Sequence, residues 1–219
     1  MVECRDIFIK YLENIGFNAD SVIDSFDIYY RELVEINQYI NLFSRKMNVE
    51  DIWQRHFLDS ISIFEVCKDW EKKNILDFGT GGGLPGLPIK ILEQSCKMTL
   101  LDSTQKKIES LKSIVSKLKL EDKGMDCFVP RNDICFICAR IEGKEMEYFY
   151  GQYDVIVCRA VKITPQISAS MKKLLNKKGR IYLYKSGNYD DVKLFKDFHV
   201  YKLNSQIFGE RNIVEIKNG

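Results

Sequence analysis

The sequence predicts an α/β protein with a seven-stranded, mostly parallel sheet and an N-terminal helical cap. Three observations lead to this prediction. Residues 1–66 have apolar side chains at helical spacing, seven short apolar runs follow from Asn74 onward, and most of these runs are separated by stretches long enough for a helix. Short strands that alternate with helices are typical of an open parallel sheet with helices on both faces.

Three helices are expected ahead of the sheet. Apolar residues recur at helical spacing in the first two, at Ile7, Tyr11 and Leu12 and then at Ile28, Leu33, Ile36 and Ile40. A third helix is expected from about Val49 to Trp70. We therefore predict a helical cap over residues 1–70 and a sheet-bearing domain over residues 71–219.

The strand candidates are the runs NILDF (74–78), KMTLL (97–101), ICFIC (134–138), YDVIVC (153–158), RIYLY (180–184), HVYKL (199–203) and NIVEI (212–216). Helical stretches between the earlier runs predict parallel pairing, because parallel neighbours need a crossover of about a dozen residues or more. The last two runs are separated by a short segment, so they are predicted to form an antiparallel hairpin. ICFIC is apolar throughout and is predicted to be a buried strand.

The composition excludes several classes of protein. No stretch approaches the roughly 18 consecutive apolar residues of a membrane span, and the first residues lack the basic and apolar regions of a secretory signal. We therefore expect a monomeric cytoplasmic protein with no membrane segment.

The cysteines do not form a recognisable framework. They number seven, an odd set without regular spacing, which does not fit paired disulfides. Cys135 and Cys138 form a CxxC pair, and no second such pair or His pair completes four zinc ligands. We expect no metal and interpret these two cysteines as buried thiols.

The net charge of +2 hides an uneven distribution. Residues 1–66 carry twelve acidic and six basic side chains, and this net charge of −6 would repel phosphate. Residues 155–189 carry no carboxylate and eight basic side chains, namely Arg159, Lys162, Lys172, Lys173, Lys177, Lys178, Arg180 and Lys185. We expect a polyanion to approach this tract, with Lys172 and Lys173 as contacts; a solvated helix face is the alternative.

A glycine-rich turn follows the first predicted strand. Asp77, Gly79, Gly81 and Gly83 form the pattern DxGxGxG. Glycine allows positive φ and lets the backbone approach a ligand closely. Pro85 suits the first turn of the helix that follows, where its missing N–H is not needed. The turn therefore predicts a ligand site at the carboxyl end of the first strand.

The ligand class depends on the next strand. Asp102 ends it, 23 residues after Gly79, and a carboxylate there can accept both ribose hydroxyls of an adenosine. The turn also fits the GxGxxG pattern of nicotinamide dehydrogenases, through Gly81, Gly83 and Gly86. S-adenosylmethionine is favoured, because Asp77 would repel a pyrophosphate, the last strand pair is antiparallel, and no substrate domain with a catalytic His follows.

Further short segments match a known family. They are INLFS (40–44), RHFLDS (55–60), DFGTGGGLPGLP (77–88), LLDS (100–103), ARIEG (139–143), VIVCRAV (155–161), LYKSG (183–187) and GERNIVEIK (209–217). With these segments the chain resembles the ribosomal small-subunit methyltransferase G family, also called glucose-inhibited division protein B, from about Tyr39 to the C-terminus. Phe43 replaces a more usual Thr, and residues 121–138 form a longer, cysteine-bearing stretch than the family often has.

The resemblance implies a class I S-adenosylmethionine-dependent methyltransferase sheet. It also implies S-adenosylmethionine as the donor and, as the acceptor, N7 of a guanine in the 16S ribosomal RNA loop that lines the decoding centre. The implied partner is this RNA or the small ribosomal subunit. Carried over by position, the family's cofactor contacts fall on Gly79, Leu84, Ile141, Glu142 and Arg159. The expected cofactor site is completed by Asp77, Gly81, Gly83 and Asp102.

Guanine N7 loses no proton when it attacks a methyl group, so we assign no general base. The sequence agrees, because CRAV follows the fourth run in place of a Pro-Pro-aromatic signature and no Pro-Cys marks a pyrimidine C5 nucleophile. His56 and Asp59, three residues apart on the third predicted helix, could contact each other or the substrate. Lys185 and Arg211, at later strand ends, are expected to bind RNA phosphate.

Two other functions fit the same sheet. One is a methyltransferase for a small molecule, and the other is a binding protein that has lost turnover. A small substrate would call for an enclosing apolar lid, whereas the chain has a basic tract and an acidic cap. The intact glycine turn argues against the loss of turnover.

Overall fold

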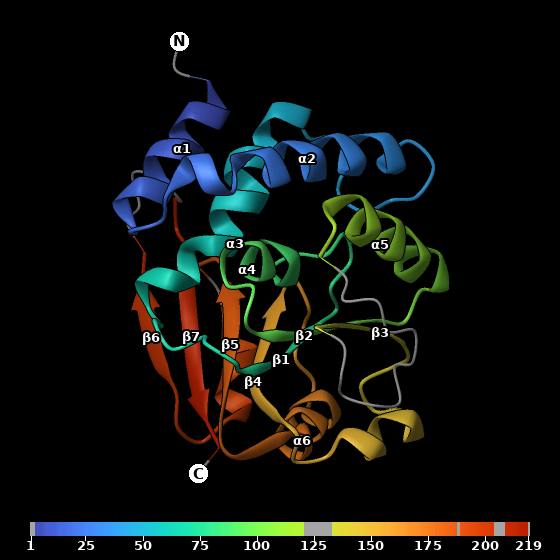
Figure 1. Ribbon diagram of the computed structural model, residues 1–219. Coiled ribbons are helices and arrows are strands. Elements are labelled where there is room, and N and C mark those ends of the chain that lie inside the picture. Colours follow the sequence, from blue (N-terminus) through green and yellow to red (C-terminus); the bar gives the residue numbers. More distant parts are fainter. Residues whose placement is uncertain (1–2, 121–132, 188, 204–208, 219) are drawn as a thin grey trace.

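The computed structural model describes residues 3–120, 133–187, 189–203 and 209–218 (Figure 1). Within these ranges the sheet has seven strands in the order β3-β2-β1-β4-β5-β7-β6. Their bounds are β1 (Asn74–Phe78), β2 (Lys97–Asp102), β3 (Ile134–Cys138), β4 (Tyr153–Arg159), β5 (Leu175–Lys185), β6 (His199–Lys202) and β7 (Asn212–Lys217). All seven predicted strands are therefore confirmed. Their ends agree within one residue except that β5 begins at Leu175, five residues before the predicted run.

The pairing also follows the prediction. Strands β1 to β5 are parallel to one another, whereas β7 is antiparallel to both β5 and β6. The reversal follows from the short connection between β6 and β7, which cannot hold a crossover helix. The carboxyl ends of β1, β2, β4 and β5 therefore lie together along one edge of the sheet.

The α-helices are α1 (Cys4–Asn14), α2 (Ile23–Asn37), α3 (Asp59–Ile61), α4 (Gly86–Leu92), α5 (Gln105–Leu118) and α6 (Pro165–Leu174). Shorter turns of 3-10 helix are η1 (Ala19–Ser21), η2 (Val49–Asp51), η4 (Ser62–Glu65), η5 (Lys144–Phe149) and η6 (Asp190–Leu194). The third predicted helix consists of η2, a π-helical segment η3 (Trp53–Leu58), α3 and η4 in succession. It ends at Glu65, so the predicted end at Trp70 is wrong. Trp70 is instead buried beyond the helix, and its indole N–H donates to the Cys67 carbonyl.

The helical cap packs directly onto the sheet. One buried cluster contains Phe8 of α1, Phe26 of α2, Phe57 of η3 and Tyr182 of β5. On the opposite face, Met171 of α6 packs with strand residues in a second cluster. Figure 1 shows α1 and α2 beyond the carboxyl ends of the strands and α6 near the opposite ends. The division of the chain at residue 70 into two domains stays a prediction.

Strand β3 is less buried than its sequence indicates. It lies at the edge of the sheet and pairs with β2 alone. Cys135 is half-buried and Cys138 is exposed, so the prediction of a buried strand with buried thiols is wrong for both. Of the cysteine-bearing stretch 121–138, residues 121–132 lie outside the described residues. None of the helices that the structure describes is long and apolar enough to cross a membrane.

Candidate functional site

The glycine turn between β1 and α4 depends on conformations that favour glycine. Gly79, Gly81 and Gly83 have φ angles of +72°, +56° and +94°. A Cβ at Gly79 would lie 2.5 Å from Cγ2 of Val161, and a Cβ at Gly83 would lie 2.6 Å from Cδ1 of Leu87. At Gly81 the nearest atoms would be 3.9 Å away. A Cβ would therefore clash with neighbouring side chains at Gly79 and Gly83, whereas at Gly81 it would make only ordinary van der Waals contact with the backbone oxygens of Gly79 and Leu42.

Asp77 forms hydrogen bonds with the glycine turn and with the start of α4. Its side chain is fully buried, and Oδ2 accepts hydrogen bonds from Thr80 Oγ1 at 2.7 Å and from the Gly86 N–H at 2.8 Å. Oδ1 has no hydrogen-bond partner among the described residues. Burial raises the pKa of Asp77 to about 6, although these two hydrogen bonds lower it in part. Helix α4 begins at Gly86, so Pro85 is its N-cap residue and lies just before the first turn in which the sequence analysis placed it.

Asp102 lies beside the turn, as the sequence predicts from its place at the end of β2. Its Oδ2 accepts from the Gly81 N–H at 3.1 Å, and its Oδ1 accepts from the Thr104 N–H at 2.9 Å. Lys107 Nζ lies 3.7 Å from Oδ2. An ionised carboxylate has about four acceptor positions, so capacity remains for the hydroxyls of a ligand.

The remaining predicted cofactor residues lie around this centre. Leu84 is buried, and its N–H donates to the Thr80 carbonyl at 2.9 Å. Ile141 is buried and Glu142 is exposed, in the turn that follows β3. That turn is tied to β2, because the Ala139 N–H donates to the Asp102 carbonyl at 3.2 Å. The structure thus brings the ends of β1, β2 and β3 together at one place.

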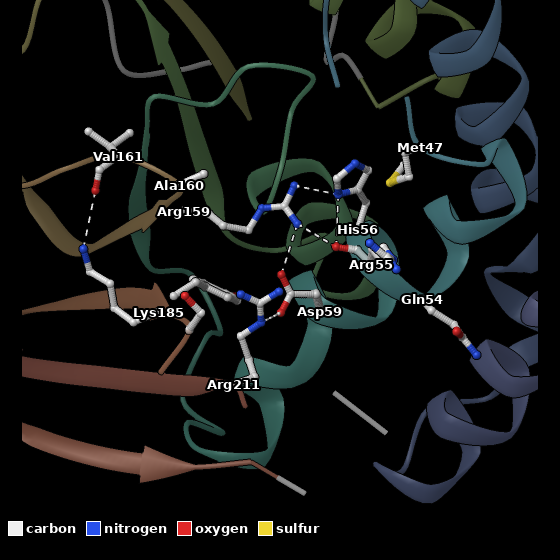
Figure 2. A pocket seen from close by; sticks show the side chains of 12 residues that line it. Met47, Gln54, Arg55, His56, Asp59, Arg159, Ala160, Val161, Lys185 and Arg211 are labelled. Carbon is white, nitrogen blue, oxygen red and sulfur yellow. Dashed lines mark hydrogen bonds and ion pairs between the residues drawn. The ribbon is translucent and has the colours of Figure 1, made fainter. Parts of the chain in front are cut away.

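A cavity of about 740 Å³ adjoins the glycine turn at the ends of β4 and β5 (Figure 2). Its wall includes four basic side chains and one acidic side chain: Arg55, Arg159, Lys185, Arg211 and Asp59. Val161 also lines the cavity and lies over Gly79. The cavity and the glycine turn therefore share a wall.

Arg159 is held on several sides. Its Nη1 donates to Asp59 Oδ2 and to the Arg55 carbonyl, each at 3.1 Å, and its Nη2 lies 3.2 Å from His56 Nδ1 (Figure 2). Asp59 also forms an ion pair with Arg211, whose Nε lies 2.7 Å from Oδ1. The His56–Asp59 contact that the sequence suggests as one alternative is not among the hydrogen bonds of the described residues. His56 on the π-helical segment η3 and Asp59 at the start of α3 both contact Arg159 instead.

His56 is neutral in this environment. Burial lowers its pKa to about 3, and the charge of Arg159 adds to the effect. His56 Nδ1 lies 3.0 Å from the Arg55 carbonyl, which can only accept a hydrogen bond, and 3.2 Å from Nη2 of Arg159, which can only donate one. The tautomer with a proton on Nδ1 satisfies the first contact, and the tautomer with a proton on Nε2 satisfies the second. Nε2 is buried and has no hydrogen-bond partner among the described residues.

The other predicted basic residues divide between two ends of the sheet. Lys185 lines the cavity and pairs with Asp191, with Nζ 2.6 Å from Oδ2. Lys172 and Lys173 lie in the last turn of α6, which returns the chain to the start of β5. There the Gly151 N–H, just before β4, donates to the Lys173 carbonyl at 2.8 Å. The structure therefore does not bring these two lysines together with the cavity.

Sequence comparison places the chain in a family. The sequence model of the family described as rRNA small subunit methyltransferase G matches residues 22–206. The chain belongs to this family.

Curated relatives carry the same family name, Ribosomal RNA small subunit methyltransferase G. The relative from Syntrophus aciditrophicus is 34% identical over 78% of this chain and 66% of its own length. The relative from Clostridium botulinum strain Loch Maree is 38% identical over 72% of this chain and 59% of its own length. The relative from Mycoplasma capricolum is 32% identical over 88% and 76%, respectively. The chain thus spans less than two thirds of the length of some of these family members.

Solved structures confirm the fold. A predicted O-methyltransferase from Agrobacterium tumefaciens superposes with a TM-score of 0.57 at 13% identity, over 74% of this chain and 80% of that one. A SAM-dependent methyltransferase from Aquifex aeolicus superposes with a TM-score of 0.55 at 13% identity, over 74% of this chain and 92% of that one. The family member described here therefore has the sheet of an S-adenosylmethionine-dependent methyltransferase, as the sequence predicts.

Proposed function

We propose that the protein transfers a methyl group from S-adenosylmethionine to N7 of a guanine in 16S ribosomal RNA, in the loop that lines the decoding centre. Family membership supports the reaction class. The observation that carries the proposal is the shared wall between the glycine turn and a cavity with four basic side chains. A donor site and a site for an anionic substrate are then direct neighbours. We further propose that the protein acts as a monomer in the cytoplasm.

The residues around the glycine turn fit S-adenosylmethionine. Gly81 has no side chain that would keep a ligand from its backbone, and a buried acceptor is offered by Asp77 Oδ1, which has no hydrogen-bond partner among the described residues. Asp102 has acceptor capacity for ribose hydroxyls. The further proposed contacts are Gly79, Gly83, Leu84, Ile141, Glu142 and Arg159, of which Arg159 also borders the cavity proposed for RNA. S-adenosylmethionine would supply the methyl group on a sulfonium, and a carboxylate nearby favours such a cation.

The cavity fits an RNA nucleotide. Arg55, Lys185 and Arg211 can bind phosphate oxygens, and Arg159 lies between them and the cofactor turn. His56 cannot serve as a base near neutral pH, because its pKa is lowered to about 3. N7 needs no base, so these residues mainly hold the guanine in line with the methyl group. Alignment of this kind can contribute as much as ~7–11 kcal/mol in well-oriented systems.

Lys172 and Lys173 are proposed as a second, distant contact with RNA. Strand β4 has seven residues between the two ends of the sheet, which corresponds to about 20 Å at ~3.3 Å per residue. A single nucleotide cannot contact both ends, but folded ribosomal RNA can. The proposed partner is therefore the 16S RNA or the small subunit.

A small-molecule methyltransferase is the second candidate. The volume of the cavity favours it, because about 740 Å³ lies within the usual range for small ligands. The test is to map N7-methylguanine in 16S ribosomal RNA from cells with and without the gene. We expect the modification to disappear from one guanine without the gene and to return with the wild-type gene. An unchanged methylation pattern would favour the small-molecule candidate.

A further inference from the structure

Asp59 occupies an unusual position between two arginines. It begins α3, directly after the π-helical segment, and its side chain is only 3% exposed. Arg159 reaches it from the end of β4, and Arg211 reaches it from the residue before β7. Figure 2 shows both guanidinium groups converging on this carboxylate at the cavity wall.

The carboxylate permits the two guanidinium groups to lie close together. Without it, two positive charges in a half-buried wall would repel each other. Asp59 balances one of the two charges, and His56 adds none because its imidazole is neutral. The set of Asp59, Arg159 and Arg211 therefore keeps one surplus positive charge beside the cavity.

The contacts also restrict the orientation of the two guanidinium groups. Arg159 has further hydrogen bonds to the Arg55 carbonyl and to His56, so its plane is defined. The side chain of Arg211 is 27% exposed and lines the cavity. A guanidinium has five N–H donors. The contact of Arg211 Nε with Asp59 Oδ1 is an ion pair at 2.7 Å and not a hydrogen bond, and the Nη groups of Arg211 form no hydrogen bond to another described residue. Both arginines thus offer donors from positions that Asp59 sets.

Stability alone is a weak explanation for this arrangement. Buried ion pairs often contribute little to stability compared with apolar side chains of similar volume. The cluster also lies at a cavity wall, where a ligand gains from donors that are already oriented.

We propose that Asp59 is a positioning residue that holds Arg159 and Arg211 so that they bind one phosphate of the RNA strand carrying the target guanine. This inference rests on the proposed function. It names the part of the substrate that the cavity wall recognises, and it assigns the recognition to an acidic residue that would not contact the phosphate itself.

The first test compares Asp59→Asn with the wild type. The substitution keeps the shape of the side chain and removes its charge. We expect the affinity for a fluorescent RNA hairpin of the decoding loop, and kcat/KM for that RNA, to fall about 10²-fold, as displaced binding groups can cause. Arg31→Ala, which removes an exposed arginine from α2, is the control and should lose less than about twofold. Wild-type RNA affinity in Asp59→Asn would overturn the inference.

A double variant then separates positioning from an independent role. If Asp59 acts through Arg211, the two substitutions are not independent. The Asp59→Asn/Arg211→Ala variant should then lose less RNA affinity than the product of the fold-losses of the two single variants. Losses that multiply would show that Asp59 does not act through Arg211 and would overturn that part of the inference.

Arg211→Lys tests the same idea with Asp59 intact, so it remains informative if Asp59→Asn does not fold. Lysine keeps the charge, but its ammonium cannot reproduce the planar fork of arginine. We expect a loss of RNA affinity close to that of Arg211→Ala. Wild-type affinity would show that charge alone suffices and that no positioning is needed. Because RNA affinity is measured without methyl transfer, the inference can hold even if the transferred group or the target atom proves different.

Discussion

Val161 lies where a Cβ on Gly79 would have to go, with Cγ2 at 2.5 Å from that position. Gly79→Ala should therefore disturb the glycine turn through a clash and through its positive φ, which costs an alanine about 1–2 kcal/mol. We expect a marked loss of S-adenosylmethionine affinity by calorimetry. Gly79→Ala/Val161→Ala should recover part of it, because the clash is removed and the backbone cost remains. No recovery in the double variant would show that Val161 does not constrain the turn.

Gly81 differs from Gly79, because a Cβ at Gly81 would meet only two backbone oxygens, each at 3.9 Å, and would not clash. Replacement by a larger residue such as leucine should leave the fold intact apart from the cost of its positive φ. The new side chain would occupy the proposed path of the cofactor, so S-adenosylmethionine binding should be abolished. Calorimetry with S-adenosylmethionine and S-adenosylhomocysteine measures this, and circular dichroism checks the fold. Parental affinity in this variant would contradict the assignment of the turn.

The raised pKa of Asp77 predicts a pH dependence of cofactor binding. The pKa of the Asp77 carboxyl group rises from its ordinary value of 3.8 to about 6 on folding, so between these pH values the folded protein binds the carboxyl proton more tightly than the unfolded chain does. Its contribution to stability is thus present below 3.8 and is lost as the pH rises through about 6. The affinity for cationic S-adenosylmethionine should change in the opposite direction and rise between pH 5 and pH 7. In Asp77→Asn the affinity should not rise with pH over this range. If the affinity of the variant rises as much as that of the wild type, another titratable group causes the pH dependence.

His56→Gln tests the absence of a general base. Single-turnover methyl transfer should lack a rising limb near neutral pH, since N7 loses no proton on attack. The variant should lose far less than the ~10²–10⁴-fold expected for removing a base. Arg159→Ala is the comparison and should slow transfer or weaken binding. Loss of most of the rate in His56→Gln, with binding and fold intact, would mean that a protonation step exists.

Lys172→Ala/Lys173→Ala tests the distant RNA contact. Each phosphate contact releases counterions, so the double variant should bind RNA less tightly and with a weaker dependence on salt. S-adenosylmethionine affinity should not change, because the two lysines lie far from the glycine turn. If the salt dependence equals that of the wild type, these lysines are a solvated helix face.

The sequence was informative where the signal is local. Apolar runs and their spacing predicted all seven strands and the antiparallel last pair, and glycine spacing predicted the turn beside Asp102. Burial of ICFIC was mispredicted, because an apolar run does not show whether its strand lies at the edge of a sheet. The position of Lys172 and Lys173 could have been inferred, since a crossover helix must return the chain to the start of the next parallel strand.

The contacts of Asp59 could not be predicted from the sequence. Arg159 and Arg211 are 100 and 152 positions further along the chain, and a single sequence contains no signal that pairs residues so far apart. The π-helical segment was equally hidden, because helical periodicity does not distinguish it from an ordinary α-helix. Tertiary packing determines both features.

The cavity wall is assembled from distant parts of the chain, since Arg55 and Asp59 come from the cap and Arg211 comes from the residue before the last strand. A polyanion bound there would contact both the helical cap and the residue before the last strand. Binding and unfolding are then thermodynamically linked, and ligand at one hundred times its Kd would add about 2.7 kcal/mol to the free energy of unfolding. The cap would gain from this linkage as much as the sheet, so substrate should protect residues 1–66 from proteolysis although most of them never touch it.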